Sequence, residues 1–275
     1  MREEVRLTRR VTFSAGHRYW IPSKSEADNR ALFGKWASPY NHGHNYVLEV
    51  TVEGRVDPAT GMVVNIKDVD DVLQEKVVDR FDGKSINDEI EHFHAQSTSL
   101  ENLMAHFAEI LGGPSVLPAR FIGLRLEEMP LLYGELWLEP ERKMTITRVY
   151  EFAAAHRLHS PSLSEEENIE LFGKCNNPAG HGHNYLLEVS VQGEPDPQTG
   201  MSVDLAELDR MVEELVVDRY DHKNLNVDLP EFQGRPTSSE ALTQEIFQRL
   251  DGRLPAKLSK VRLHETARNI FEVRR

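Results

Sequence analysis

Six histidines in this chain have types and spacing suited to binding metal ions, and they fall into two sets of three. In the second half, one residue separates His181 from His183, and His156 lies 25 residues before His181. Residues two apart at the start of a strand point to the same face of a sheet. Three neutral imidazoles with an open fourth position are typical of a catalytic zinc site. The sequence therefore predicts Zn²⁺ bound by His156, His181 and His183.

The first half repeats this spacing with His17, His42 and His44. Buried histidines that bond only to backbone groups are the alternative interpretation. That alternative does not explain why these six recur when other histidines do not. We therefore expect a second zinc site in the first half. The histidines without a counterpart are expected on the surface or in loops, and they are His92, His94, His106 and His159.

A lone cysteine lies close to the second set of histidines. Cys175 precedes His181 by six residues, in a polar segment that contains Lys174 and Asn176. A nearby metal and polar neighbours would favour the thiolate, which can act as a general base. A small buried apolar side chain is the alternative interpretation.

Two further features of the second half point to proton transfer and to ligand binding. Asp221 directly precedes His222, and a carboxylate can orient an imidazole and raise its basicity. Glu265 stands near the end of a predicted strand and could accept two parallel N–H bonds from a ligand. For Glu265, a solvated surface carboxylate is the alternative.

These side chains belong to a chain in which one domain occurs twice. The segments 32–35 and 42–46 recur as 171–174 and 181–185, each at an offset of 139 residues. Further on the offset is 137, and we place the two-residue difference in the intervening loop and helix. A domain-sized period that occurs twice indicates duplication rather than a solenoid. The predicted domains are 1–140 and 141–275.

Each half shows the pattern strand, strand, helix, helix, strand, strand. Alternating apolar residues indicate strands, and apolar residues at helical spacing indicate helices. Thr98 and Thr237 are each followed by glutamate three residues later, which predicts a capping box at the second helix. The fold class is α+β, with a four-stranded antiparallel sheet and two helices in each domain. The expected strands are 5–15, 46–52, 121–127 and 132–138, then 145–155, 185–191, 260–263 and 269–273; the first helices are 66–77 and 205–216.

Composition excludes several classes of protein. The chain has 275 residues, 39% hydrophobic and 28% charged, with a formal net charge of −13. This charge argues against an overall basic surface for nucleic acid or anionic membrane. The sequence shows no secretion signal and no apolar run of the ~20 residues that span a bilayer. A single cysteine fits a reducing compartment, so we expect a cytoplasmic protein that binds neither nucleic acid nor membrane.

Taken together, these motifs resemble the 6-pyruvoyltetrahydropterin synthase family. The resemblance covers nearly all of 145–275, and an altered copy covers about 5–138. The motifs that carry it are Phe152-x-Ala154-x-His156, the segment 175–185 (Cys-Asn-Asn-Pro-x-Gly-His-Gly-His-Asn-Tyr), Asp221-His222-Lys-Asn-Leu, Pro236-Thr237-Ser-Ser-Glu240 and His264-Glu265-Thr266.

The resemblance implies a tunnelling fold and a zinc-dependent reaction on 7,8-dihydroneopterin triphosphate. In that reaction triphosphate is eliminated and the side chain undergoes internal redox, which gives 6-pyruvoyltetrahydropterin. By position, the three histidines of the second half would hold the zinc ion. Cys175 would be the general base, and Asp221 with His222 would relay protons. Glu265 would bind the pterin, with Thr237 and Thr266 nearby.

The first half departs from the family pattern at the residues that move protons. Trp36, Gly83 and Met129 stand where the second half has Cys175, His222 and Thr266. Asp82 and Glu128 are retained. We expect this half to bind zinc without catalysis, with Glu128 as a candidate pterin ligand that could also serve regulation.

The resemblance also implies a homo-oligomer. Domains of the family pair edge to edge into barrels, which removes exposed sheet edges, and active sites lie at the interfaces. Six domains would make a trimer of this two-domain chain, and a hexamer is the larger possibility. Because a site built from Cys175 and Gly83 would lack its histidine, we expect second-half domains to face one another.

Two other functions remain open from the sequence. The related 6-carboxytetrahydropterin synthase of queuosine biosynthesis uses the same substrate and zinc but releases acetaldehyde and triphosphate. The longer spacing from Cys175 to His181 favours the pyruvoyl enzyme. A non-catalytic pterin-binding protein is the second alternative, and the intact Cys175, Asp221 and His222 argue against it.

Overall fold

The computed structural model describes residues 3–275, which divide into two compact units. The first consists of the chain up to Ile146 together with Gln192–Val203. The second consists of Thr147–Val191 and Asp204–Arg275. Both combine a sheet with helices, which confirms the α+β class. No helix within residues 3–275 is long and apolar enough to cross a membrane.

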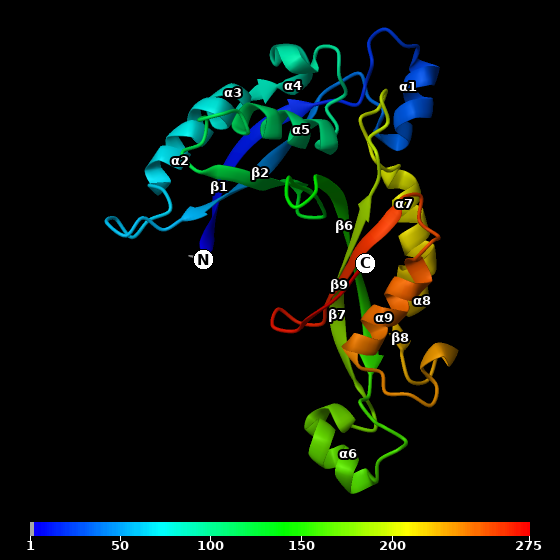
Figure 1. Cartoon of the computed structure of the whole chain (residues 1–275). Helices are drawn as coiled ribbons and strands as arrows, with labels where there is room; N and C mark the ends of the chain where they lie inside the picture. The colour runs from blue at the N-terminus through cyan, green and yellow to red at the C-terminus, as the bar shows by residue number, and fades with distance from the viewer. Residues whose placement is uncertain (1–2) are drawn as a thin grey trace. The chain divides into compact units, whose positions relative to one another are not determined.

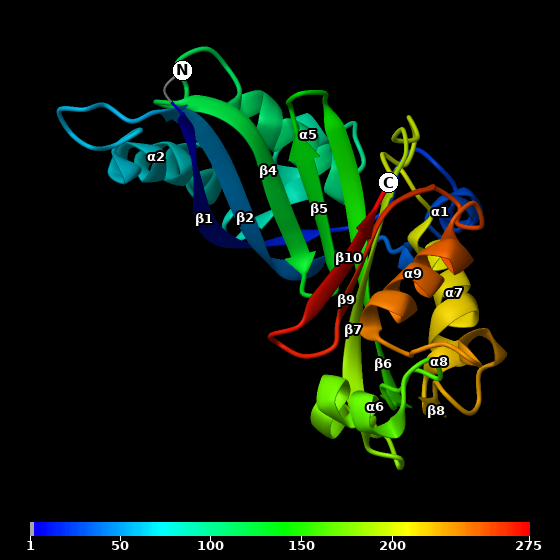
Figure 2. The same cartoon turned by 60° about the horizontal axis from the view of Figure 1, so that its bottom comes forward.

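The sheet of the first unit has the strand order β3-β1-β2-β4-β5 (Figures 1 and 2). The four long strands pair antiparallel, and the short β3 pairs parallel with β1. The strands are β1 (Glu4–His17), β2 (His42–Arg55), β3 (Lys84–Ser85), β4 (Arg120–Met129) and β5 (Leu132–Trp137). The helices are α1 (Glu26–Phe33), α2 (Ile66–Leu73), α3 (Asp79–Phe81), α4 (Ile86–Glu89) and α5 (Leu100–Leu111).

The second unit repeats these elements with strand order β10-β9-β7-β6, and β8 pairs parallel with β6. Figure 1 shows α7, α8 and α9 along one face of its strands. The strands are β6 (Lys143–His156), β7 (His181–Gln192), β8 (Lys223–Asn224), β9 (Lys257–His264) and β10 (Ile270–Arg274). The helices are α6 (Glu165–Phe172), α7 (Leu205–Val212), α8 (Asp218–Tyr220) and α9 (Ser239–Leu250).

Alternation along the strands directs one face of each sheet toward the helices. In β2 the buried apolar residues are Tyr46, Leu48, Val50 and Val52, each two positions apart, as expected for a strand covered on one side. A stacked aromatic pair lies beside each histidine set. Phe13 packs on Tyr46 at 5.0 Å, and Phe152 packs on Tyr185 at 5.1 Å between ring centroids. These pairs anchor the strand segments that carry the histidines.

The predicted long elements are confirmed, but the shorter helices were missed, namely α1, α3 and α4 in the first half and α6 and α8 in the second. Helices α1 and α6 both begin with a capping box, formed by Ser25 with Asp28 and by Ser164 with Glu167. Serine followed three residues later by an acidic residue is the signal that marks such a start. It was present in both segments.

The predicted caps of the second helices were wrong by one residue. Ser99 caps α5 by accepting a bond from the Asn102 amide, and Ser238 caps α9 through the Ala241 amide. The Thr237 hydroxyl instead donates to the Arg157 carbonyl at 3.0 Å. Thr98 likewise donates to the Arg18 carbonyl. The threonines therefore tie each helix start to the end of a strand.

One further expectation is narrowed to the loop, and one needs correction. Because α5 and α9 have equal length at an offset of 139, the two-residue difference lies after the helix, in 112–119 against 251–256. His106 lies on α5 rather than on the surface or in a loop, and it is half-buried. Burial lowers the pKa of His106 to about 4.

We expect Ser238→Ala to destabilise the protein by about 1 kcal/mol, the usual cost of losing a helix N-cap. Ser238→Asp should keep most of the stability because aspartate is also a good cap. Urea unfolding followed by circular dichroism would measure both variants. Equal stability of Ser238→Ala and the unmodified chain would contradict this assignment of the cap.

Candidate functional site

The three histidines of the second unit come together where two neighbouring strands meet. His156 ends β6, and His181 and His183 open β7. Their ring centroids are 4.7, 5.2 and 5.0 Å apart. One ligand atom from each residue lies within 4.8 Å of the others. The three histidines that sequence spacing predicts to form one set therefore lie together in the structure.

Hydrogen bonding fixes the orientation of the buried member of this set. His156 Nδ1 lies 2.7 Å from the Thr237 carbonyl oxygen. A carbonyl only accepts, so Nδ1 must carry the proton, which leaves Nε2 free to ligate. In the part of the chain described, Nε2 of His156 and of His183 and Nδ1 of His181 are buried without a hydrogen-bond partner. Unsatisfied buried nitrogens on three converging imidazoles fit a metal ion.

The local environment favours the neutral form that metal ligation requires. Burial lowers the pKa of His156, His181 and His183 below the ordinary value. Neighbouring imidazoles add to this effect, because two positive charges at such short range repel. At neutral pH each ring therefore offers a lone pair rather than a second proton.

The first unit contains the same arrangement. Ring centroids of His17, His42 and His44 are 4.5, 5.1 and 5.0 Å apart. His17 Nδ1 lies 3.2 Å from the Thr98 carbonyl oxygen. Burial, together with the neighbouring His42, lowers the pKa of His17 to about 3 and that of His44 to about 4. Among residues 3–275, Nε2 of His17 and of His44 is buried without a hydrogen-bond partner.

Glu265 lies beside the second set, at the end of β9. Its Oε1 is 3.8 Å from Nε2 of both His156 and His183. Ser239 donates to Oε1 at 2.6 Å, and the Asn269 side chain donates to Oε2 at 2.9 Å. Although burial opposes it, these bonds lower the pKa of Glu265. A fixed, ionised carboxylate thus borders the candidate metal position.

Cys175 lies on the short 3₁₀ turn Gly173–Asn176, half-buried and not in a disulfide. The Leu158 amide donates to its carbonyl at 2.9 Å. Arg157 donates to both Asn176 oxygens, at 3.1 and 2.9 Å. These bonds hold the turn against the residues that directly follow His156.

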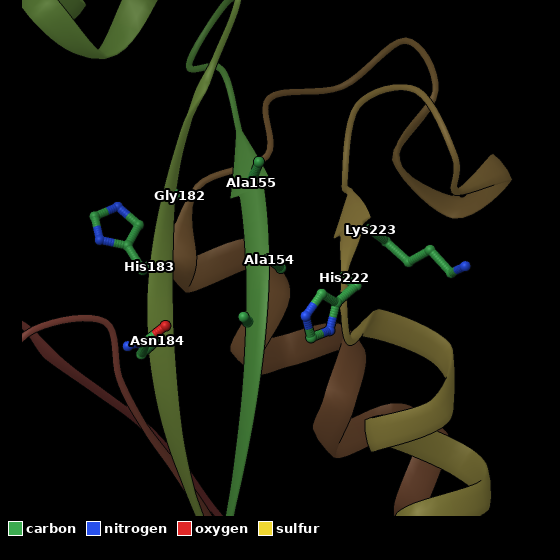
Figure 3. A pocket seen from close by; sticks show the side chains of 8 residues that line it. Ala154, Ala155, Gly182, His183, Asn184, His222 and Lys223 are labelled. Carbon is green, nitrogen blue, oxygen red and sulfur yellow. The ribbon is translucent and has the colours of Figure 1, made fainter.

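Asp221 and His222 form the predicted pair at the edge of β6. Asp221 Oδ1 accepts from the Ala153 amide at 2.7 Å, and Oδ2 lies 2.7 Å from His222 Nδ1. The bond from Ala153, followed by that from His222, lowers the pKa of Asp221. His222 lines a pocket of about 370 Å³, and residues 182–184 of β7 are also among its lining residues. Figure 3 shows the imidazoles of His183 and His222 on opposite sides of the strand pair, not facing one another.

Comparison with known proteins identifies the family. The model of the family "6-pyruvoyl tetrahydropterin synthase" matches residues 6–136 and again 145–275. The chain belongs to this family, twice over.

Individual relatives agree with that match. A 6-pyruvoyl tetrahydrobiopterin synthase of Poecilia reticulata is 49% identical over 135 residues, which are 49% of this chain and 92% of the relative. The solved 6-pyruvoyl tetrahydropterin synthase of Caenorhabditis elegans is 46% identical, covers 48% of this chain and 94% of its own, and superimposes with a TM-score of 0.46. A 6-carboxy-5,6,7,8-tetrahydropterin synthase of Rickettsia felis is 25% identical over 48% of this chain and 99% of its length.

The two copies of the family domain differ around the retained glutamates. Glu128 is buried, and its Oε1 lies 3.5 Å from His44 Nε2. At the offsets of 139 and 137, Ser239 and Asn269 correspond to Leu100 and Leu132. The first copy therefore lacks both side chains that hold Glu265 in the second.

The first copy keeps local backbone features of the second although Gly83 and Trp36 replace His222 and Cys175. Asp82 Oδ1 accepts from the Ser14 amide at 2.8 Å, as Asp221 does from Ala153. Gly83 has φ +72°, and His222 has φ +55°. Trp36 occupies the turn that carries Cys175 in the other copy, with Lys35 4.6 Å over its ring.

The two threonines near the site make local contacts. The Thr237 carbonyl orients His156, and its hydroxyl binds the Arg157 carbonyl. Thr266 is exposed, and its Oγ1 accepts from the Arg268 and Asn269 amides. Sequence reasoning missed the roles of Ser239 and Asn269, because no motif spacing marks a residue that supports another side chain.

We expect the metal-free protein to lose stability between about pH 6.5 and 5. The pKa values of buried histidines are lowered on folding, so the unfolded chain takes up protons first as pH falls. Each such group removes up to about 1.4 kcal/mol per pH unit. Carboxylates whose pKa is lowered on folding change the free energy of unfolding mainly below about pH 5.

Urea unfolding in the presence of a chelator would measure this slope. His17→Gln and His156→Gln should each reduce it. A free energy of unfolding that does not change between pH 6.5 and 5 would contradict the assignment of neutral buried imidazoles.

Proposed function

We propose that the chain is a zinc-dependent 6-pyruvoyltetrahydropterin synthase, with catalysis in the second copy. Its substrate would be 7,8-dihydroneopterin triphosphate, converted with loss of triphosphate to 6-pyruvoyltetrahydropterin. The observation that carries this proposal is the three-histidine cluster with unsatisfied ring nitrogens beside the ionised Glu265. The names of relatives that are 41–49% identical over 46–49% of the chain support it.

The metal would be held by His156, His181 and His183. When bound, Zn²⁺ supplies a Lewis acid that acidifies hydroxyl groups of a ligand. The protein contributes the tautomer of His156, set by the Thr237 carbonyl. It also contributes a partly buried site, in which a charge is screened less than in open water.

Glu265 would recognise the pterin. Its carboxylate is ionised and held by Ser239 and Asn269, and each carboxylate oxygen can accept further bonds. The 2-amino group and the adjacent ring N–H of a pterin present two parallel donors, which match such a carboxylate. This contact would place the side chain of the substrate toward the histidines.

Proton transfer would involve Cys175 on one side of the substrate and the Asp221–His222 pair on the other. Elimination of triphosphate with internal redox needs a proton removed and another returned, with no external oxidant. Asp221 accepts from the Ala153 amide through one oxygen and holds His222 through the other. It would thereby keep the imidazole ready to accept at its second nitrogen.

Assembly would complete this site. Within one copy, His183 and His222 lie on opposite sides of the strands (Figure 3), so a relay at the metal would come from a neighbouring copy. We propose domains 1–140 and 141–275, each a tunnelling fold. Three chains would supply six domains, closed into barrels, with second-copy domains facing one another.

The first copy would bind zinc through His17, His42 and His44 without catalysing the reaction. Trp36 and Gly83 remove the thiol and the imidazole, and Glu128 lacks the two side chains that hold Glu265. Pterin binding at Glu128 would then be weaker than at Glu265.

Incubation of the zinc-loaded chain with 7,8-dihydroneopterin triphosphate should yield 6-pyruvoyltetrahydropterin and triphosphate. Mass spectrometry with a trap for acetaldehyde would identify the products. Carboxytetrahydropterin with acetaldehyde would replace this proposal by the activity named for the Rickettsia felis relative. Tight pterin binding without turnover would leave a binding protein.

Cys175→Ala should lower kcat at least about 100-fold, the usual contribution of a general base, while zinc content and circular dichroism stay unchanged. Trp36→Ala, the matched change in the first copy, should leave kcat within about twofold. Full activity of Cys175→Ala would remove the thiol from the mechanism. Residual activity that Trp36→Ala abolishes would show catalysis in the first copy.

A further inference from the structure

A third cluster of possible metal ligands lies in the first unit, apart from both histidine sets. His92 comes from the 3₁₀ turn Glu91–Phe93, and His106 and Glu109 come from α5. One ligand atom from each lies within 4.8 Å of the other two. His106 and Glu109 are three residues apart on a helix and so share a face. The helix and the preceding turn thus aim three donors at one point.

The two imidazoles of this cluster lie close together, and one of them has a buried ring nitrogen without a partner among the described residues. Their ring centroids are 4.1 Å apart with planes tilted by 32°. Phe93 and Phe81 surround His106 at 5.3 and 6.0 Å. Within the described residues, Nδ1 of His106 is buried and has no hydrogen-bond partner. Leaving a buried nitrogen without a partner is unfavourable, and a metal bond would offset that cost.

In the second copy, glutamates and arginines occupy the positions that correspond to this cluster. At the offset of 139 that joins α5 to α9, His92 and His106 correspond to Glu231 and Glu245. Arg219 binds Glu231 at 2.9 and 2.6 Å. Arg249 bonds to both glutamates, at 3.0 and 3.5 Å. The second copy thus satisfies the position with an ion-pair network.

In the first copy the partners of that network have also changed. Arg249 becomes Ile110, and Arg235, which binds Glu245, becomes Gln96. Gln248 becomes Glu109. Relative to the second copy, two arginines and two glutamates are therefore absent, and two imidazoles and the Glu109 carboxylate are present instead. Arg80 remains at the position of Arg219, and Arg142 also lines the cavity beside the cluster.

We propose that His92, His106 and Glu109 form a divalent transition-metal site, preferentially for Zn²⁺, that is present only in the first copy. Two imidazole nitrogens and one carboxylate oxygen are a ligand set that zinc uses, with water in the open position. Ligands about 2.1 Å from one zinc ion lie up to roughly 4 Å apart. The three ligand atoms lie within 4.8 Å of one another, so small rotations of the side chains would bring them to that spacing, and the exposed Glu109 side chain has room to rotate.

The surroundings leave room for the fourth ligand. A cavity of about 480 Å³ adjoins the cluster, lined by residues that include His92, His106 and Glu109. Water in this cavity could complete the coordination. The proposed site shares no residue with either histidine set, so it does not depend on the proposed synthase activity.

Zinc binding by the full chain would test this site. Metal-free protein would be dialysed against buffers of fixed free zinc, and bound zinc would be measured by plasma mass spectrometry. His92→Gln and Glu109→Gln should each bind one zinc equivalent fewer than the unmodified chain, or weaken that equivalent at least about tenfold. Because the result is a difference, it does not depend on how many ions the other sites hold.

His94→Gln is the matched control, since His94 is exposed and lies two residues from His92. It should keep the full zinc content. Crystals of the zinc-loaded chain should also show an anomalous peak between His92 and His106. Equal zinc binding by all four proteins, or the lack of that peak, would overturn the proposal.

Discussion

The hydrogen bond from a buried imidazole to a backbone carbonyl is the interaction on which both histidine centres depend. His156 donates to the Thr237 carbonyl, and His17 donates to that of Thr98. Each threonine directly precedes the serine that caps the second helix of its copy. The cap therefore fixes the start of the helix, the helix start places the carbonyl, and the carbonyl turns Nε2 toward the other two rings. Orientation from outside the ligand set is what makes such a centre selective for one geometry.

Comparison of the two copies distinguishes residues that both contain from residues that only the second contains. Both copies keep the imidazoles, the orienting carbonyl and the aspartate that accepts from the first strand. Asp82 makes this backbone bond although no histidine follows it, so the contact has a structural value of its own. Asp221 adds a second contact with its other oxygen. The thiol, the second imidazole and the two side chains that hold Glu265 occur only in the second copy, at positions where the first copy has Trp36, Gly83, Leu100 and Leu132.

Much of this could be predicted from the sequence because repetition supplied an internal check. The recurrence of His156, His181 and His183 at constant offset set these candidate ligands apart from isolated histidines, and strand periodicity placed the two on β7 on one face. The caps were wrong because Thr237 and Ser238 are both good capping residues, and only tertiary contact with Arg157 decides between them. The prediction for His106 was wrong because the absence of a repeat counterpart does not report burial. The apolar residues around it at helical spacing indicate its place on α5. Ser239 and Asn269 hold Glu265 from α9 and from the β9–β10 turn. These segments come together only in the folded chain, so no sequence motif predicts the contacts.

His222 adopts a backbone conformation that is unfavourable for a residue other than glycine. A non-glycine residue in the left-handed region costs about 1–2 kcal/mol, and His222 adopts φ +55°. Gly83 adopts the same conformation at the equivalent place without that cost. Glycine is thus the less strained solution for this turn, and the first copy has it. A histidine that persists there, bonded to Asp221 and 82% exposed at its side chain, gives the fold nothing that glycine would not. Its retention is explained if the imidazole meets a partner outside its own copy, as the proposed assembly requires.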